Sequence, residues 1–186
     1  MTALDKTPSN LNLLSPLGFK FVVQKLPHVN FFVQNASIPG FTLPHVNRGT
    51  PFVNIPYAGD HIEYQPLHLT FKVDEDFQSY IELHSWLRGL GFPREFDEYA
   101  NLLQQDRLGT MVGRNVLNTS GQGLYSDASL IILTNLKNAN IEFTFKDTFP
   151  VSISQLNFET TPSDVVMVNC SVEFNYTLFE VAMIPK

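Results

Sequence analysis

The sequence predicts a mainly β protein: an antiparallel β-sandwich or barrel with one flanking α-helix and a long extended excursion. Three observations carry this prediction. Apolar and polar residues alternate with a period of two in several segments, one segment has helical periodicity, and one apolar segment is interrupted by four prolines. With 186 residues, the chain is long enough for a single β domain over residues 17–186 whose core needs no disulfide or metal.

The composition is poor in charge. Charged residues make up 16% of the chain and hydrophobic residues 44%, including 16 phenylalanines, whereas an average domain has about 25% charged residues. We therefore expect part of the surface to be buried against other subunits. The net charge of -6 argues against a protein that grips nucleic acid, because binding phosphates requires clustered Lys and Arg. No apolar run reaches the roughly 18 residues of a membrane span, so we expect no membrane association.

The N-terminal third begins with a predicted arm and two strands. Residues 1–16 have no clear period and contain two prolines, so they predict a flexible arm. Residues 18–25 alternate, with Phe19, Phe21 and Val23 on one face, which is typical of a strand. Residues 30–37 are compatible with a second strand.

Residues 38–60 predict the extended excursion. Prolines at 39, 44, 51 and 56 exclude a central strand, because proline cannot donate to the ladder. The apolar side chains of the excursion are Phe41, Leu43, Val46, Phe52, Val53, Ile55 and Tyr57. Two arrangements would cover them: the excursion folds back over one sheet of its own chain, or it packs on a neighbouring subunit.

The middle of the chain predicts a strand followed by a helical segment over residues 75–105. Residues 67–73 alternate and predict a strand. Asp74 is a plausible N-cap for an amphipathic helix over 75–90, and a second short helix is predicted over 94–105. Residues 106–126 contain four glycines and little pattern, which indicates a loop that is mobile or ordered by a partner.

The C-terminal third predicts four strands, over residues 128–134, 141–146, 151–158 and 165–179. The last strand has two faces. Its apolar face is predicted to hold Val166, Val168, Cys170, Val172, Phe174, Tyr176 and Leu178. Its polar face is predicted to hold Asn169, Ser171, Glu173, Asn175 and Thr177.

Signals of chemistry are missing from the sequence. The histidines have no metal-binding spacing, and no nucleophile elbow, phosphate loop or dinucleotide fingerprint occurs, so we expect no enzyme, metal or cofactor. Carboxylates cluster at 74–76 and 95–98, where helix capping explains them. Cys170 is expected in the core. Four arginines are candidates for pairing between subunits: Arg88, Arg94, Arg107 and Arg114.

The order of several segments resembles a known family. They are GFKFVVQKLPHVNFFVQNASIPG, TPFVNIPYAGDHIEYQPLHLTFKVDED, SYIELHSWLRGLGFP and SDASLIILTNLKNANIEFTFKDTFPVSIS. Together they resemble the tail-tube-like virion proteins of contractile-tailed bacteriophages, and the likeness spans about residues 18–179. The resemblance implies a β-barrel or sandwich with a flanking helix, six copies of which form a ring whose inner wall is a continuous sheet.

The resemblance also implies roles for two surfaces. Residues 41–57 would contact neighbouring subunits and the adjacent tube or baseplate ring, and the polar face of the last strand would line a lumen through which DNA passes without specific binding. It further implies the tail sheath as a neighbour, a place in the virion, and host cytoplasm as the site of assembly. The glycine-rich loop is longer than a minimal tube subunit needs, which favours a specialised ring at the baseplate end.

Two other functions are compatible with the residues. A receptor- or glycan-binding β-sandwich would use exposed Tyr57, Tyr64 or Tyr125 to stack on sugar. A hydrolase would need the carboxylates of Asp74 to Asp76, for which no partner nucleophile or base is visible in the sequence.

Overall fold

The computed structural model describes residues 12–91, 93–99, 102, 124–160 and 167–184. The elements in chain order are β1 (Phe19–Val23), α1 (Pro27–Phe32), β2 (Val33–Ala36), β3 (Phe41–Thr42), β4 (His45–Gly49), β5 (Asn54–Ala58), β6 (Glu63–Tyr64), β7 (Leu67–Lys72), α2 (Gln78–Gly91), β8 (Ser126–Leu133), β9 (Ala139–Ile153), β10 (Asn169–Asn175) and β11 (Leu178–Met183). Every strand pairing is antiparallel. The predicted mainly β, antiparallel class is confirmed. No described helix is long and apolar enough to cross a bilayer.

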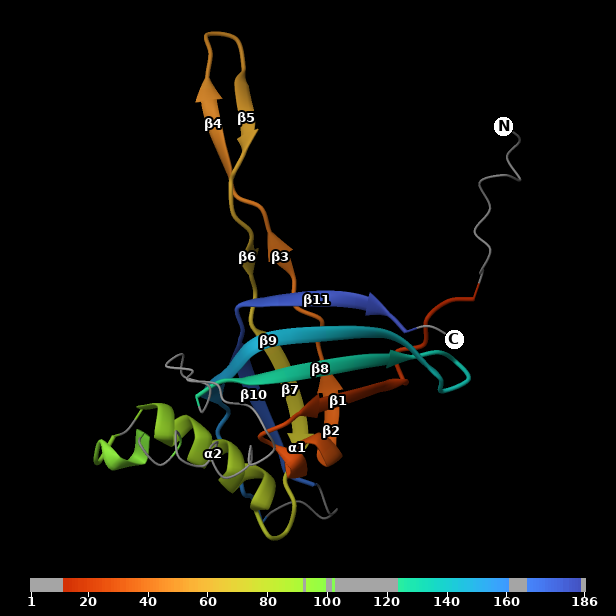
Figure 1. The fold of residues 1–186 in the computed structure, drawn as a ribbon, viewed down its shortest axis with the longest axis vertical. Helices are drawn as coiled ribbons and strands as arrows, with labels where there is room; N and C mark the ends of the chain where they lie inside the picture. Colours follow the sequence, from red (N-terminus) through yellow and green to blue (C-terminus); the bar gives the residue numbers. More distant parts are fainter. Residues whose placement is uncertain (1–11, 92, 100–101, 103–123, 161–166, 185–186) are drawn as a thin grey trace, which may run out of the picture.

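The long strand β9 joins two parts of one sheet. Its first part pairs with β8 on one side and β11 on the other, and β8 pairs with β1. From Phe149 onward β9 pairs with β10, which continues through β7 to β2. Figure 1 shows β1, β8, β9 and β11 crossing the direction of β2, β7 and β10. The sheet therefore folds over itself and encloses a core.

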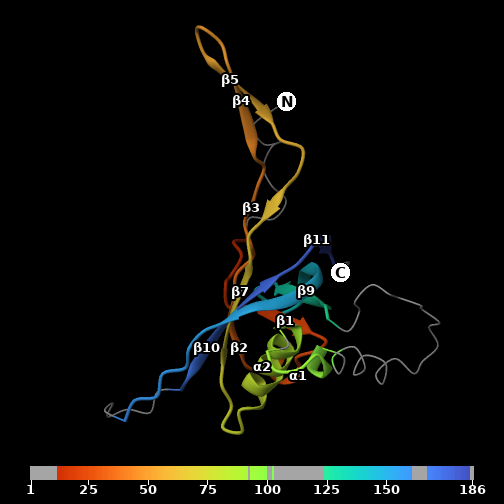
Figure 2. The same cartoon turned by 90° about the vertical axis from the view of Figure 1, so that its left-hand side faces the viewer.

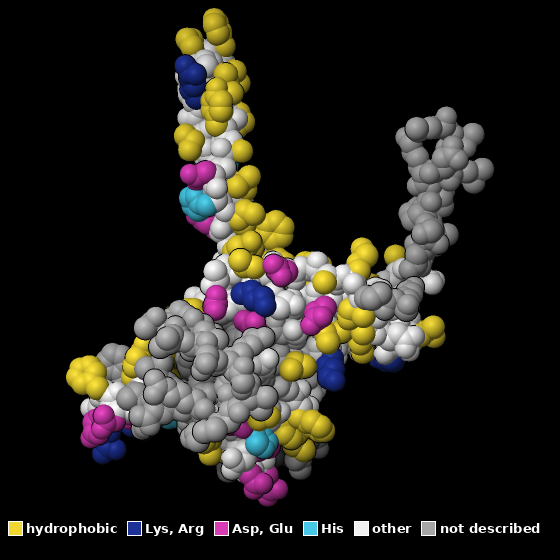
Figure 3. Space-filling view, in the orientation of Figure 1, with side chains coloured by type: hydrophobic (Ala, Val, Ile, Leu, Met, Phe, Trp, Pro, Cys, Tyr) yellow, Lys and Arg dark blue, Asp and Glu magenta, His cyan; other side chains and the backbone are white. Residues whose placement is uncertain are grey.

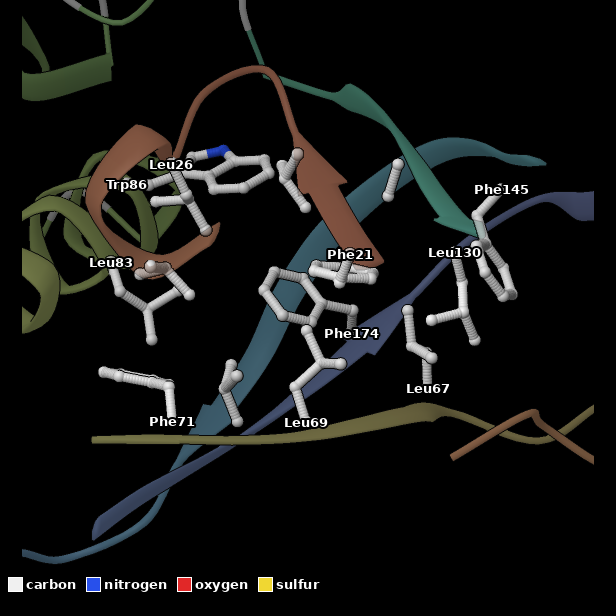
Figure 4. Close-up of a cluster of buried hydrophobic side chains, with 14 of the residues drawn as sticks. Phe21, Leu26, Leu67, Leu69, Phe71, Leu83, Trp86, Leu130, Phe145 and Phe174 are labelled. Atoms are coloured by element: carbon white, nitrogen blue, oxygen red, sulfur yellow. The ribbon is translucent and has the colours of Figure 1, made fainter. Parts of the chain in front are cut away.

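The core lies between these two parts of the sheet (Figure 4). Alternate residues of the strands point into it, and the most deeply buried large side chains are Phe71, Phe145 and Phe174. Helix α2 adds Leu83 and Trp86, and the indole Nε1 of Trp86 donates to the carbonyl of Leu124 at 2.8 Å. The expectation for Cys170 is confirmed, because its side chain is fully buried and this burial raises the pKa of the thiol.

Helix α1 replaces the first part of the predicted strand over residues 30–37, so that prediction was wrong for residues 30–32. Pro27 occupies the first turn, where proline's missing N–H is harmless. The side chain of Asn30 binds both the N–H and the carbonyl of Val23, each at 2.8 Å. These bonds tie α1 to the end of β1, a long-range contact that local alternation does not report.

Helix α2 begins at Gln78, three residues later than predicted. Asp74 still acts as its cap, because its carboxylate accepts hydrogen bonds from the backbone N–H groups of Gln78 at 2.9 Å and Ser79 at 3.0 Å. Burial opposes ionisation of Asp74, but the bonds from Ser79 and Gln78 outweigh it and lower the pKa of the carboxyl. Of the second predicted helix, residues 97–99 and 102 are helical, residues 94–96 are not, and residues 100–101 and 103–105 lie outside the described residues.

Strand β9 corrects the prediction of two separate strands at 141–146 and 151–158. The residues between them, 147–150, continue the strand, with Asp147 in the left-handed region at φ 54°. Asp127 stabilises the backbone here, because its carboxylate accepts hydrogen bonds from Lys146 Nζ at 3.0 Å and from the backbone N–H of Asp147 at 3.3 Å. The strand ends at Ile153, so residues 154–158 are not part of it.

The predicted last strand, residues 165–179, is two strands in the structure. Its buried face is confirmed at Cys170, Val172 and Phe174. The strand is interrupted at residues 176–177, between β10 and β11, and the alternation shifts there. Leu178 is therefore 37% exposed, while Phe179 packs against the core. The predicted inward position of Leu178 was wrong. Residues 165–166 lie outside the described residues, as do 1–11 of the predicted arm and 106–123 of the predicted loop.

Candidate assembly surfaces

The excursion is a two-stranded β-ribbon that stands away from the body (Figures 1 and 2). We call residues 38–66 the projecting hairpin. The pairs β3–β6 and β4–β5 extend it beyond β2 and β7. Every strand in such a ribbon has a free edge, which is why it tolerates its prolines. In the single chain the hairpin does not fold back over a sheet, so that alternative is wrong for the isolated subunit.

Backbone contacts close the hairpin along its length. The N–H of Gln65 donates to the carbonyl of Gly40 at 2.9 Å, and the N–H of Gly59 donates to the carbonyl of Pro44 at 2.7 Å. A Cβ at Gly59 would lie 2.5 Å from that carbonyl oxygen, so this position requires glycine. The tip is a turn over Thr50–Val53, in which the Thr50 hydroxyl and the Val53 carbonyl are 2.5 Å apart. The hairpin is thus a formed element rather than a loose loop.

The hairpin is amphipathic. Residues directly opposite each other in an antiparallel pair project to the same face, and successive pairs alternate. Val46 lies opposite Tyr57 and Arg48 opposite Ile55, so these four share one face. The other face holds the intervening pairs, His45–Ala58, Asn47–Pro56 and Gly49–Asn54. One face is therefore largely apolar and has no partner within the described chain.

The seven residues predicted as inter-subunit contacts are exposed. The exposed fractions are Phe41 61%, Leu43 52%, Val46 70%, Phe52 97%, Val53 62%, Ile55 41% and Tyr57 50%. Figure 3 shows hydrophobic side chains distributed along the projecting hairpin. The contacts that they make with a neighbouring subunit remain a prediction.

An aromatic cluster anchors the hairpin to the body. Phe41 lies 6.1 Å and Tyr64 5.5 Å, centroid to centroid, from the ring of Phe179 on β11. The hydroxyl of Tyr176 donates to the carbonyl of Gln65 at 2.9 Å, and burial raises the pKa of Tyr176 to about 12. Sequence reasoning placed Phe41 on the free part of the excursion, but it also packs at this root. We call Phe41, Tyr64, Tyr176 and Phe179 the root cluster. These residues are far apart in sequence, so no local pattern revealed the cluster.

The outer face of β7 and β10 is a polar wall. The register sets Asn169 opposite Lys72, Ser171 opposite Thr70 and Glu173 opposite His68. Hydrogen bonds link the rows: the hydroxyls of Thr70 and Ser171 are 3.1 Å apart, and Ser152 donates to Glu173 at 2.9 Å. We define the polar wall by its outward side chains on the two strands, which are His68, Thr70, Lys72, Asn169, Ser171, Glu173 and Asn175.

Four of the five predicted lumen residues belong to this wall. Thr177 does not, because it lies in the break between β10 and β11, where its N–H donates to the carbonyl of Lys146. Sequence reasoning missed His68, Thr70 and Lys72. Their outward alternation was visible in residues 67–73, but the pairing of β7 with β10 was not. The lining of a lumen by these residues is an expectation at this point.

The residues of the alternative functions are occupied otherwise. Tyr64 belongs to the root cluster and Tyr125 stacks edgewise on Phe149 at 5.4 Å, while Tyr57 lies on the hairpin. The carboxylate of Asp74 is committed to capping α2. The part of the chain that the structure describes holds no cluster of three or more His, Cys, Asp or Glu side chains suited to a metal ion.

The arginines proposed for pairing between subunits differ in their surroundings. Arg88 pairs with Glu98 of its own chain, which also explains one carboxylate of the cluster at 95–98. Arg94 is exposed. Arg107 and Arg114 lie outside the described residues.

Comparisons with known proteins agree with this architecture. The family described as phage tail tube protein matches residues 8–182. The tail tube terminator protein of Enterobacteria phage T4 is 26% identical over 171 residues, covering 87% of this chain and 85% of that protein. Among solved structures, the tube-terminating cap of the anti-feeding prophage has a TM-score of 0.55 at 8% identity, covering 99% of this chain and 100% of that chain.

A second solved structure, from the six-fold symmetrised baseplate of the anti-feeding prophage, has a TM-score of 0.54 at 14% identity, covering 93% of this chain and 97% of that chain. At these identities the two solved structures show the fold alone. The match over residues 8–182 shows more, and it agrees with the predicted resemblance. The chain therefore belongs to the phage tail tube protein family, a family of structural tail components.

Proposed function

We propose that six copies of this chain form a ring of the phage tail, with the polar wall lining the lumen and the projecting hairpin contacting neighbouring subunits. The ring is a conduit for DNA during ejection, and its neighbours are adjacent tube or baseplate rings and the sheath. The family model is that of a tail tube protein and the T4 relative is named as a tube terminator, which supports a place within the tube or at its end. The observation that carries the proposal is that one chain presents two exposed surfaces of opposite character, the polar wall and the apolar face of the projecting hairpin.

The chemistry of the polar wall suits a passage for DNA. Hydroxyl and amide groups make up most of it, the formal charges of Lys72 and Glu173 cancel, and Glu173 lies 3.4 Å from His68 Nδ1. Binding of phosphates depends on clustered Lys and Arg, and this wall has no such cluster. A neutral wall of hydrogen-bonding groups therefore keeps water in the lumen and does not retain the DNA backbone.

The hairpin suits contact between subunits. Its apolar face lies outside the core, and exposed apolar patches on soluble proteins mark interaction sites. Large aromatic side chains such as Phe52 and Tyr57 carry much of the binding energy at interface centres. These side chains are in water when the chain is isolated, so the free energy falls when a neighbouring subunit covers them.

The first test is the solution mass of the purified protein together with negative-stain imaging. We expect particles of six times the monomer mass that appear as rings with a central channel. A compact monomer that never assembles, at any protein concentration and in the presence of the other tail components, would contradict the proposal.

A second test probes which surface faces the lumen. Ser171→Arg adds a cation to each copy of the polar wall, and a ring then presents six of them, so we expect the rings to retain short DNA at low salt. Ser129→Arg, on the outer face of β8, is the matched control and is expected to retain less DNA inside the channel. Equal retention by both variants would rule out the polar wall as the lumen lining.

A further inference from the structure

We propose that the apolar face of the projecting hairpin docks on the far pole of a second copy, with Arg48 facing Glu75 and Asp76. This inference deepens the proposed function by naming the surface that receives the hairpin, and it rests on that function. The receiving surface is the β7–α2 turn with the apolar side chains beside it.

The hairpin brings apolar area and a positive charge. Between residues 38 and 59 there is no Asp or Glu, and Arg48 is the only Lys or Arg, in a chain whose net charge is -6. Arg48 shares the face of Val46, Ile55 and Tyr57 and makes no ion pair with another described residue. With roughly 3.3 Å per residue, strands β3 and β4 carry this face about 30 Å from the body, beyond reach of its own core.

The far pole brings apolar area and negative charge. Glu75 and Asp76 are exposed and, within the described chain, unpaired, whereas Asp74 beside them is used by the cap of α2. Phe158 is 70% exposed and stacks on Phe77 at 6.2 Å, next to these carboxylates. Ile81, 48% exposed, follows one helical turn later. The two surfaces therefore match in polarity and are opposite in charge.

The two surfaces lie at opposite ends of the molecule. Figures 1 and 2 place the tip of β4–β5 at one end of the long axis and the turn between β7 and α2 at the other. A hairpin cannot reach the far pole of its own chain, but it can reach that of a second copy arranged head to tail. Such a contact uses two different patches, so it repeats from one ring to the next.

The expected strength comes from the number of copies. A single exposed ion pair contributes little, and salt screens it. A ring presents six hairpins at once, so a small effect at each copy is multiplied across the contact between two rings. The ion pairs select the partner surface, and the apolar side chains supply most of the buried area.

The test is a charge swap in the full chain, with stacked rings counted by negative-stain imaging and sedimentation. We expect Arg48→Glu to reduce stacking at least about tenfold, and Glu75→Arg combined with Asp76→Arg to do the same. The chain with all three changes is expected to stack again. Lys20→Glu and Glu180→Lys, on the outer face of β1 and β11, are controls expected to stack like the wild type.

The outcomes separate this inference from the proposed function. Rings that stack normally with Arg48→Glu, or that fail to recover in the combined variant, overturn the docking surface while the ring stands. The docking surface is also overturned if wild-type rings never stack on one another. A chain that forms no ring at all overturns the proposed function, and the docking surface with it.

Discussion

Two regions of this molecule use similar residues for different ends. In the body, Phe174 is fully buried between the two parts of the sheet, whereas Phe52 at the hairpin tip is 97% exposed. Both are phenylalanines in strand-rich, apolar segments. The difference is that β10 has strands on both sides and Trp86 of α2 packs on Phe174, while the hairpin has only itself. Apolar residues of the body stabilise the fold, and those of the hairpin are left for assembly.

The root cluster is the boundary between these regions. Phe179 touches the hairpin through Phe41 and Tyr64, and the body through Phe143 and Phe145. It fixes the direction of the hairpin relative to the sheet. Substitutions in the body, at the boundary and at the tip should therefore have effects on folding that decrease in this order.

The largest effect is expected in the body. Phe174→Asp places an unpaired carboxylate in the core, which costs several kcal/mol and should leave the chain unfolded. Circular dichroism and solubility measure this outcome, and Phe174→Leu is the control that keeps the site apolar. A stable, folded aspartate variant would show that the buried face of β10 is not where the structure has it.

At the boundary, Phe179→Ala should destabilise the chain by about 3 kcal/mol, because the ring is shared by hairpin and body. Urea unfolding gives the free energy, and hydrogen exchange of the Gln65 amide reports the hairpin root. Val181→Ala, on the exposed edge of β11, is the matched control with a change within about 0.5 kcal/mol. Equal effects of the two would mean that the cluster does not anchor the hairpin.

The cap of α2 should matter less. Asp74→Ala removes the acceptor for two backbone N–H groups and should cost about 1 kcal/mol in urea unfolding. Because folding lowers the pKa of Asp74, its contribution is present above the unfolded pKa of about 3.9 and is lost as the pH falls. Asp76→Ala should leave the stability unchanged, and an equal loss there would refute the cap.

Ionisation of Tyr176 is expected to lower the free energy of unfolding slightly at alkaline pH. Burial raises the pKa of Tyr176 in the folded chain to about 12, against about 10 in the unfolded chain. The folded state holds this proton more tightly, so its contribution is full below about pH 10 and declines as the pH rises from there. Urea unfolding across this range should show the decline in the wild type and less of it in Tyr176→Phe. Identical pH profiles would contradict the partial burial that raises the pKa of Tyr176.

The smallest effect on folding is expected at the tip. Phe52→Asp should change the free energy of unfolding by no more than about 0.5 kcal/mol, since the side chain is already in water. The same variant should lose the contact between rings. If it assembles like the wild type, or if it unfolds, the division between body and hairpin is wrong.

Much of the body could be predicted from sequence. The alternation in residues 18–25 and 67–73 predicted strands and their buried faces, and so did the 169–175 part of the strand predicted over 165–179, because side chains of a strand alternate whatever its partners are. The prolines excluded residues 38–60 from the sheet, since a missing N–H is a local property. Asp74 was likewise predicted as a cap, because capping depends on residues close in the sequence.

Other features depended on contacts between distant residues, and only the tertiary structure decided them. Asp127 binds the backbone of β9 at Asp147, Asn30 ties α1 to β1, and the register of β7 with β10 assembles the polar wall. The root cluster likewise sets the direction of the hairpin. The sequence by itself determined which faces are apolar and where the ladder cannot continue, because those depend on neighbouring residues. Which faces meet is a matter of free energy summed over the whole chain, so it becomes visible only in the folded structure.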